Sequence, residues 1–218
     1  MVRIENLCKT FRTPTGEKIV ADNISITFPD GLSVGLLGRN GAGKSTLMEM
    51  IAGQTLPDSG KIFCDGSVSW PVGFAGSFHR DLSGAQNVRF VARVYGVDTD
   101  MLLSFVDGFA DLGGHLHAPV RTYSSGMKAR LAFAVSVGIP FDTYLIDEVT
   151  SVGDAQFRGR SQAMLQQRLR NAGAIVVTHS LKQLRALCHA AIILENGRLT
   201  FFEDLEEAIE HHKTNLVD

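Results

Sequence analysis

The feature that most constrains this chain is a glycine-rich loop that begins at residue 38. Its eight residues, Gly38-Arg39-Asn40-Gly41-Ala42-Gly43-Lys44-Ser45, fill every position of the pattern G-x-x-x-x-G-K-[ST]. The apolar run Leu32–Leu37 precedes the loop, and a segment of helical character, Lys44–Ala52, follows it. Glycines let backbone N–H groups point inward at phosphate oxygens, and the helix start adds its positive end. The loop therefore predicts a nucleotide site in which Lys44 reaches the β- and γ-phosphates and Ser45 offers its hydroxyl to Mg²⁺.

The order of strands and helices predicts an α/β fold. Short apolar runs at Leu32–Leu37, Thr143–Ile146 and Ala174–Thr178 are typical of buried strands, and Gln156–Arg170 is expected to be a helix. Strands that alternate with helices indicate a mostly parallel sheet with helices on both faces.

The middle of the chain is helical in pattern. Apolar residues keep helical spacing from Val88 to Tyr95 and from Leu102 to Phe109, and Met127–Val137 is a third expected helix. We therefore expect a single domain over 1–218, with a helical subdomain inserted at about 76–137. A last amphipathic helix is expected at Glu203–His212.

Composition excludes several classes of protein. The chain has 218 residues, with 21 Lys+Arg and 23 Asp+Glu, a formal net charge of −2. A dedicated nucleic-acid binder usually carries a basic stripe, so no nucleic-acid partner is expected. No run approaches the 20 or so apolar residues that a membrane helix requires, so the chain is not expected to cross a bilayer by itself. The three scattered cysteines are expected to be reduced thiols.

Three polar side chains follow the predicted strands. Asp147 and Glu148 end the Thr143–Ile146 run, where two carboxylates are costly unless a cation neutralises them. In a phosphate-loop enzyme Asp147 would hold Mg²⁺ through water, and Glu148 would polarise the attacking water. His179 follows Ala174–Thr178 at the ligand edge of the sheet, where it could contact the γ-phosphate. The alternatives are an exposed Asp-Glu pair and a structural histidine.

A second phosphate-binding segment is expected at Ser125-Gly126. It opens a predicted helix, with Ser125 as the expected N-cap and with backbone N–H groups open to an anion. Since the chain already has one phosphate loop, this helix start is expected to serve the nucleotide of another chain.

Other polar groups are expected to be solvated. His115 and His117 have no third metal ligand nearby, and His211-His212 is expected to be exposed. The arginines of the predicted helix at 156–170 are expected to form a solvated face: Arg158, Arg160, Arg168 and Arg170.

Together these motifs resemble the ATP-binding subunits of ABC transporters. The order is that of the family: the phosphate loop Gly38–Thr46, Ser125-Gly126, Asp147-Glu148, Ser151-Val152-Gly153-Asp154 and His179, with Phe11 at the place of the adenine-stacking aromatic. The resemblance implies a P-loop core with an antiparallel β subdomain and a helical subdomain. It also implies a head-to-tail dimer of two copies that binds two ATP molecules with Mg²⁺.

Within that family the chain looks most like the capsular polysaccharide exporter ATPases of Gram-negative bacteria. The segments that carry this similarity are Ser69–Gly76, Asn87–Arg93, Thr122–Met127 and Asp147–Asp154. The implied function is ATP hydrolysis that drives export through two copies of a polytopic permease, at the cytoplasmic face of the inner membrane. The lipid-linked polysaccharide would meet only the permease.

Other members of the family remain alternatives. One is an O-antigen exporter, whose ATPases often carry a C-terminal carbohydrate-binding domain; a chain ending soon after Glu210 is expected to lack it. Others are a teichoic-acid-like or other polysaccharide exporter, and a soluble ABC ATPase outside transport.

The chain also departs from the family. Lys128 replaces the neutral amide of the usual Leu-Ser-Gly-Gly-Gln motif, and the Gln expected before that motif is missing between Gln54 and Gln86.

Overall fold

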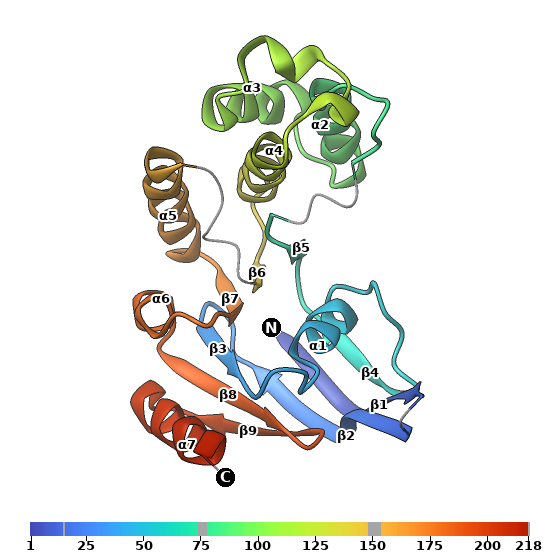
Figure 1. Ribbon diagram of the computed structural model, residues 1–218, viewed down its shortest axis with the longest axis vertical. Helices are drawn as coiled ribbons and strands as arrows, with labels where there is room; N and C mark the ends of the chain where they lie inside the picture. Colours follow the sequence, from blue (N-terminus) through green and yellow to red (C-terminus); the bar gives the residue numbers. More distant parts are fainter. Residues whose placement is uncertain (15, 74–77, 148–153, 218) are drawn as a thin grey trace. The chain divides into compact units, whose positions relative to one another are not determined.

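The computed structural model describes residues 1–14, 16–73, 78–147 and 154–217, with the side chains of 215–217 left out (Figure 1). The chain divides into two compact units. The core unit comprises Met1–Pro71, Phe141–Glu148 and Leu169–Asp218, and the helical unit comprises Val72–Pro140 and Val149–Arg168. The expected insertion at about 76–137 stays a proposal.

A six-stranded sheet forms the centre of the core unit. Its order is β5-β6-β7-β3-β8-β9, and only the edge strand β9 runs antiparallel to its neighbour. The strands are β3 (Ser33–Leu37), β5 (Val68–Pro71), β6 (Thr143–Asp147), β7 (Gly173–Val177), β8 (Ala190–Glu195) and β9 (Arg198–Phe202). Every residue of β3 and β7 is buried, as expected for parallel strands covered on both faces. The α/β prediction is confirmed.

A three-stranded antiparallel sheet completes the core unit and confirms the implied β subdomain. Its order is β2-β1-β4, with β1 (Val2–Thr13), β2 (Gly16–Phe28) and β4 (Ser59–Cys64). Its apolar face shares one buried cluster with α1 (Lys44–Ile51) and with alternate residues of the central strands, such as Val34, Leu36 and Ile192. This packing holds α1 against the antiparallel sheet through Leu47, Met48, Met50 and Ile51.

The core unit has two further helices, one between β7 and β8 and one after β9. They are α6 (Leu181–Leu187) and α7 (Leu205–Val217), and α7 packs against β8 and β9 (Figure 1). An ion pair joins the two helices, because Arg185 Nε and Nη2 donate to the two oxygens of Glu206 at 2.6 and 2.7 Å.

The helical unit contains α2 (Gly84–Val94), α3 (Thr99–Ala110), α4 (Ser125–Gly138) and α5 (Ala155–Leu169), with short 3-10 helices η2 (Gly113–His117) and η3 (Val120–Thr122). The helices predicted from apolar spacing are therefore confirmed. Four aromatic rings pack together between α3, α4 and α5: Phe105, Phe109, Phe133 and Phe157.

Two expectations for this unit are wrong. Ser124, not Ser125, is the N-cap of α4, since its hydroxyl accepts the Met127 N–H at 3.2 Å. Arg168 does not belong to a solvated face: its Nε donates to the Val137 carbonyl at 2.7 Å and its Nη2 to the Gly138 carbonyl at 3.4 Å. The last carbonyls of a helix need such partners, and Arg168 supplies them for α4.

The three cysteines are free thiols, as expected. Cys188 is buried, and burial raises the pKa of its thiol to about 12. Within the described ranges, no helix combines the length and the apolar character needed to span a membrane.

Candidate functional site

The glycine-rich loop joins β3 to α1. At two of its glycines, the backbone conformation and the close neighbours exclude a side chain. Gly38 has φ +149°, and a Cβ there would lie 2.4 Å from the Leu194 carbonyl oxygen. Gly43 has φ +107°, and a Cβ there would lie 2.5 Å from Val20 Cγ1. Both positions therefore require glycine, because a Cβ would clash with β8 or with β2. The loop forms a concave cradle between these two strands.

Lys44 begins α1 and folds back over this cradle. Its Nζ donates to the carbonyl oxygens of Gly38 at 2.7 Å and Arg39 at 3.0 Å. The N-cap of α1 is Gly43, which has no side chain to bond the first N–H groups of the helix. A helix start of this kind, with an ammonium group beside it, is suited to bind an anion.

A pocket of about 280 Å³ joins this loop to the ends of the neighbouring strands. Its lining comprises Lys18, Asn40, Gly41, Gly43, Lys44, Ser45, Thr46, Asp147, Val177 and His179. The strands β3, β6 and β7 are parallel neighbours, so their carboxyl ends bring the loop, Asp147 and His179 to one edge of the sheet. The structure thus unites most of the residues that the sequence singled out in this unit.

The pocket holds the two oxygen groups expected for Mg²⁺. The Ser45 hydroxyl and the Asp147 carboxylate line it together, and both are ligand types that Mg²⁺ prefers. No group of three or more His, Cys, Asp or Glu suited to a metal occurs among the described residues. A nucleotide-bound Mg²⁺ needs only one or two carboxylates, because waters and phosphates supply the rest. Glu148 lies outside the described residues.

His179 also lines an adjoining pocket of about 380 Å³, with Gly38, Arg39, Asn40 and His212. The expectation that His211-His212 is exposed is therefore wrong for His212, which is half-buried, although His211 is exposed. The missed signal is helical spacing, since His212 lies three residues after the buried Ile209 and four after the buried Ala208.

The expected adenine-stacking residue, Phe11, lies on β1 directly opposite Lys18 of β2. Residues opposite each other in an antiparallel pair share a face, so the Phe11 ring is on the same face as a residue of the phosphate pocket. The ring is 38% exposed, and Lys9 Nζ lies 5.1 Å from its centroid. The described lining of the phosphate pocket does not include Phe11, so its role stays a prediction.

Ser125 and Gly126 form the first turn of α4 in the helical unit. Their expected contact with the nucleotide of a second chain stays a prediction. Of the motif at 151–154, only Asp154 is described. It caps α5 by accepting the Phe157 N–H at 2.8 Å and binds Arg130 Nη2 at 2.5 Å. The Phe157 N–H, with help from Arg130, lowers the pKa of Asp154.

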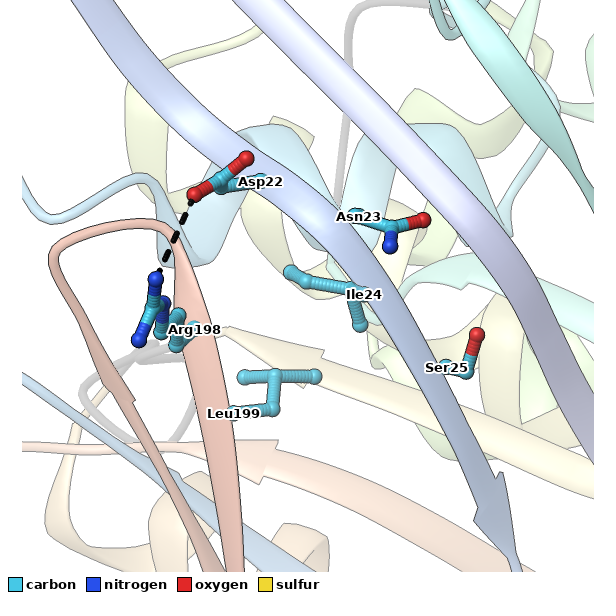
Figure 2. A pocket seen from close by; sticks show the side chains of 6 residues that line it. All are labelled: Asp22, Asn23, Ile24, Ser25, Arg198 and Leu199. Atoms are coloured by element: carbon cyan, nitrogen blue, oxygen red, sulfur yellow. Dashed lines mark ion pairs between the residues drawn. The ribbon is translucent and has the colours of Figure 1, made fainter.

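A separate hollow of about 510 Å³ has no motif in the sequence (Figure 2). Asp22, Asn23, Ile24 and Ser25 of β2 and Arg198 and Leu199 of β9 line it. Asp22 and Arg198 approach to 3.9 Å across it, and both are exposed. The hollow lies where the register of β1 and β2 shifts between Leu7 and Lys9. Its described lining offers no chemistry-bearing group beyond this exposed ion pair.

Comparisons with known proteins agree with this geometry. The family model described as ABC transporter matches residues 21–151. The polysialic acid transport ATP-binding protein KpsT of Escherichia coli is 44% identical over 98% of this chain and 96% of its own length. The capsule polysaccharide export ATP-binding protein CtrD of Neisseria meningitidis is 42% identical over 98% of this chain and 99% of its own length.

More distant relatives carry related names. The teichoic acids export ATP-binding protein TagH of Bacillus anthracis is 35% identical, and this chain spans 38% of it. Among solved structures, the ATP-binding cassette MJ0796 bound to ADP and Pi superposes with a TM-score of 0.78 over 94% of this chain and 99% of that one. At 19% identity, this likeness supports the fold alone.

Proposed function

This chain belongs to the ABC transporter family of ATP-binding proteins, and on that premise we propose that it hydrolyses ATP to drive export of a capsular polysaccharide. The choice of capsular polysaccharide as the exported polymer rests on one observation. Relatives that are 42% to 44% identical over nearly their whole length are named for transport of polysialic acid or capsule polysaccharide. The teichoic acid relative, at 35%, is further away.

The residues that the sequence singled out each have a proposed task at the nucleotide site. The loop from Gly38 to Thr46 wraps the phosphates, and the Lys44 ammonium moves from the loop carbonyls to the β/γ oxygens. Ser45 and Asp147 would hold Mg²⁺, which neutralises phosphate charge. His179 is the proposed donor to the γ-phosphate, and Phe11 is proposed to stack on the adenine.

Glu148 is the proposed general base. It follows Asp147 directly in the sequence, and a carboxylate at that point could polarise the attacking water. This assignment rests on the sequence pattern alone.

The proposed partners follow from the family. A second copy would complete each ATP site by presenting Ser125 and Gly126 from the start of α4. Two copies of an inner-membrane permease would bind the dimer at the cytoplasmic face and alone contact the lipid-linked polymer.

Deletion of the gene in its own host tests the proposal. We expect surface polysaccharide to disappear and polymer to accumulate inside the cell, with recovery from a wild-type copy but not from Lys44→Ala. Sugar analysis of the retained polymer distinguishes capsule from O-antigen or teichoic-acid-like material. Unchanged surface polysaccharide, or absence of any polytopic membrane protein on co-purification, would overturn transport in favour of a soluble ABC ATPase.

A further inference from the structure

The C-terminal helix brings a second imidazole to the phosphate loop. His212 of α7 lines the pocket of about 380 Å³ that also contains Gly38, Arg39, Asn40 and His179. Its Nδ1 is buried and has no hydrogen-bond partner in the part of the chain that the structure describes. A buried polar atom without a partner is unfavourable in a folded protein and calls for a ligand or another explanation.

The position of His212 follows from the packing of α7. Leu205, Ala208 and Ile209 are buried, and His212 continues the same stripe at the i, i+3, i+4, i+7 spacing. The neighbouring His211 is exposed, and its ring lies 5.2 Å from that of Phe202 on β9. The register of α7 therefore directs His212, and not His211, to the phosphate loop.

Two contacts anchor the start of α7. The carboxylate of Asp204 accepts the N–H groups of Glu206 and Glu207 at 2.7 and 3.1 Å. The bidentate Arg185–Glu206 pair ties α7 to α6, and α6 begins two residues after His179. His179 thus lies just before α6 and His212 lies on α7, and the ion pair between these helices favours a fixed spacing between the two histidines.

We infer that His212 is a ligand of the terminal phosphate of ATP, acting beside His179 and gaining a proton when the nucleotide binds. The inference rests on the nucleotide site proposed above and adds a residue of α7 to it. ADP lacks the group that His212 would contact, so His212 would favour ATP over ADP.

The charges around His212 favour proton uptake on binding. Burial lowers the pKa of His212, Glu195 of β8 raises it, and Lys44 and His211 lower it. Arg39 and His179 line the same pocket. Because burial and Lys44 hold its pKa below the ordinary value, the imidazole is neutral near pH 7, and a phosphate dianion beside it would favour the protonated form. The proton comes from solvent, and no bond other than N–H forms.

Calorimetric titration of the full chain with β,γ-imido-ATP and with ADP, in buffers of different ionisation enthalpy, tests this inference. We expect His212→Ala to weaken β,γ-imido-ATP binding about tenfold, as for one charge-assisted hydrogen bond, and to leave ADP binding unchanged. The proton uptake seen with wild type should fall. His211→Ala is the matched control for affinity and should bind both nucleotides as wild type does.

A second variant separates phosphate contact from helix packing. His212→Gln keeps a donor but does not titrate, so it should retain most affinity and still lose the proton uptake. Wild-type affinity and wild-type proton uptake in both His212 variants would overturn the inference and leave the nucleotide site intact. Failure of wild type to bind β,γ-imido-ATP would instead overturn the site and the inference together.

Discussion

Lys44 Nζ donates a 2.7 Å hydrogen bond to the carbonyl oxygen of Gly38, six residues earlier in the chain. The bond crosses the phosphate loop, so the ammonium of the first residue of α1 lies over the residues that wrap a phosphate. The ammonium can exchange such neutral carbonyl partners for phosphate oxygens, since charge-assisted bonds between two ions are stronger.

Replacement of Lys44 by alanine should abolish ATP hydrolysis. Loss of one charge-assisted contact should weaken ATP binding by about 1.5–3 kcal/mol, or roughly 10- to 100-fold. Phosphate release and an ATP titration measure the two effects. Lys61→Ala, an exposed lysine on β4, is the control and should retain wild-type values. Wild-type hydrolysis by Lys44→Ala would refute the site.

Replacement of Glu148 by glutamine should preserve ATP binding and stop hydrolysis, because an amide has the shape of the carboxylate but not its basicity. The uncleaved ATP should then hold two chains together. Size-exclusion chromatography with ATP and Mg²⁺ should show a dimer that ADP does not support. A variant that stays monomeric with ATP bound, both alone and with its membrane partner, would count against the shared site.

Two glycines should respond to alanine in opposite directions. Gly108 lies in the exposed part of α3 with no atom within 4 Å of an added Cβ, so Gly108→Ala should stabilise the protein by about 0.5–1 kcal/mol. Gly38 has positive φ and a carbonyl oxygen 2.4 Å from the added Cβ, so Gly38→Ala should destabilise it by about 1–3 kcal/mol or more. Thermal unfolding of both variants measures this. Equal melting temperatures would contradict the loop geometry.

Arg168 should matter more for stability than its exposed neighbour Arg158. Arg168→Ala leaves the last carbonyls of α4 without their partner and should cost about 1.5–3 kcal/mol in the free energy of unfolding. Arg158→Ala should change it by less than about 0.5 kcal/mol. Urea denaturation of each variant gives these values. Similarly small losses of unfolding free energy in both variants would support the solvated face that was expected from the sequence.

Acid should destabilise the protein through four carboxyl groups. Hydrogen bonds lower the pKa of each from its ordinary value, 3.8 for aspartate and 4.5 for glutamate: Asp58 by Lys9, Asp142 by the Ser67 N–H, Asp154 by the Phe157 N–H and Glu206 by Arg185. Such groups contribute full stability above their unfolded pKa, and the contribution is lost as pH falls through the folded pKa. The free energy of unfolding should therefore fall below about pH 4.5.

Asp142→Asn isolates one of these groups. Asp142 Oδ2 accepts the Ser67 N–H at 2.7 Å and the Ser67 hydroxyl at 2.8 Å, so the uncharged variant should show a shallower acid limb. The exposed Asp107→Asn is the matched control. An unchanged acid limb in Asp142→Asn would place the loss of stability elsewhere.

The sequence by itself determined the parts of the protein that contiguous residues encode. The loop from Gly38 to Ser45 carries its own backbone requirements, so its position between a strand and a helix could be read directly and is confirmed. The buried runs around β3, β6 and β7 were recognisable because fully covered strands are apolar throughout. The class of fold and the nucleotide chemistry followed from these local patterns.

Only the tertiary structure decided what depends on distant partners. The order β5-β6-β7-β3-β8-β9 arises from pairing between strands far apart in sequence, and it alone brings Asp147 and His179 to the loop. The sequence pattern placed Arg168 on a solvated face, but in the structure its side chain donates to the end of α4. Either serine could cap a helix, so the sequence could not distinguish Ser124 from Ser125, and the structure shows that Ser124 is the cap. The sequence predicted that His212 is exposed near the end of the chain. The packing of α7 on β8 instead buries the helix face that carries His212 and directs His212 to the phosphate loop.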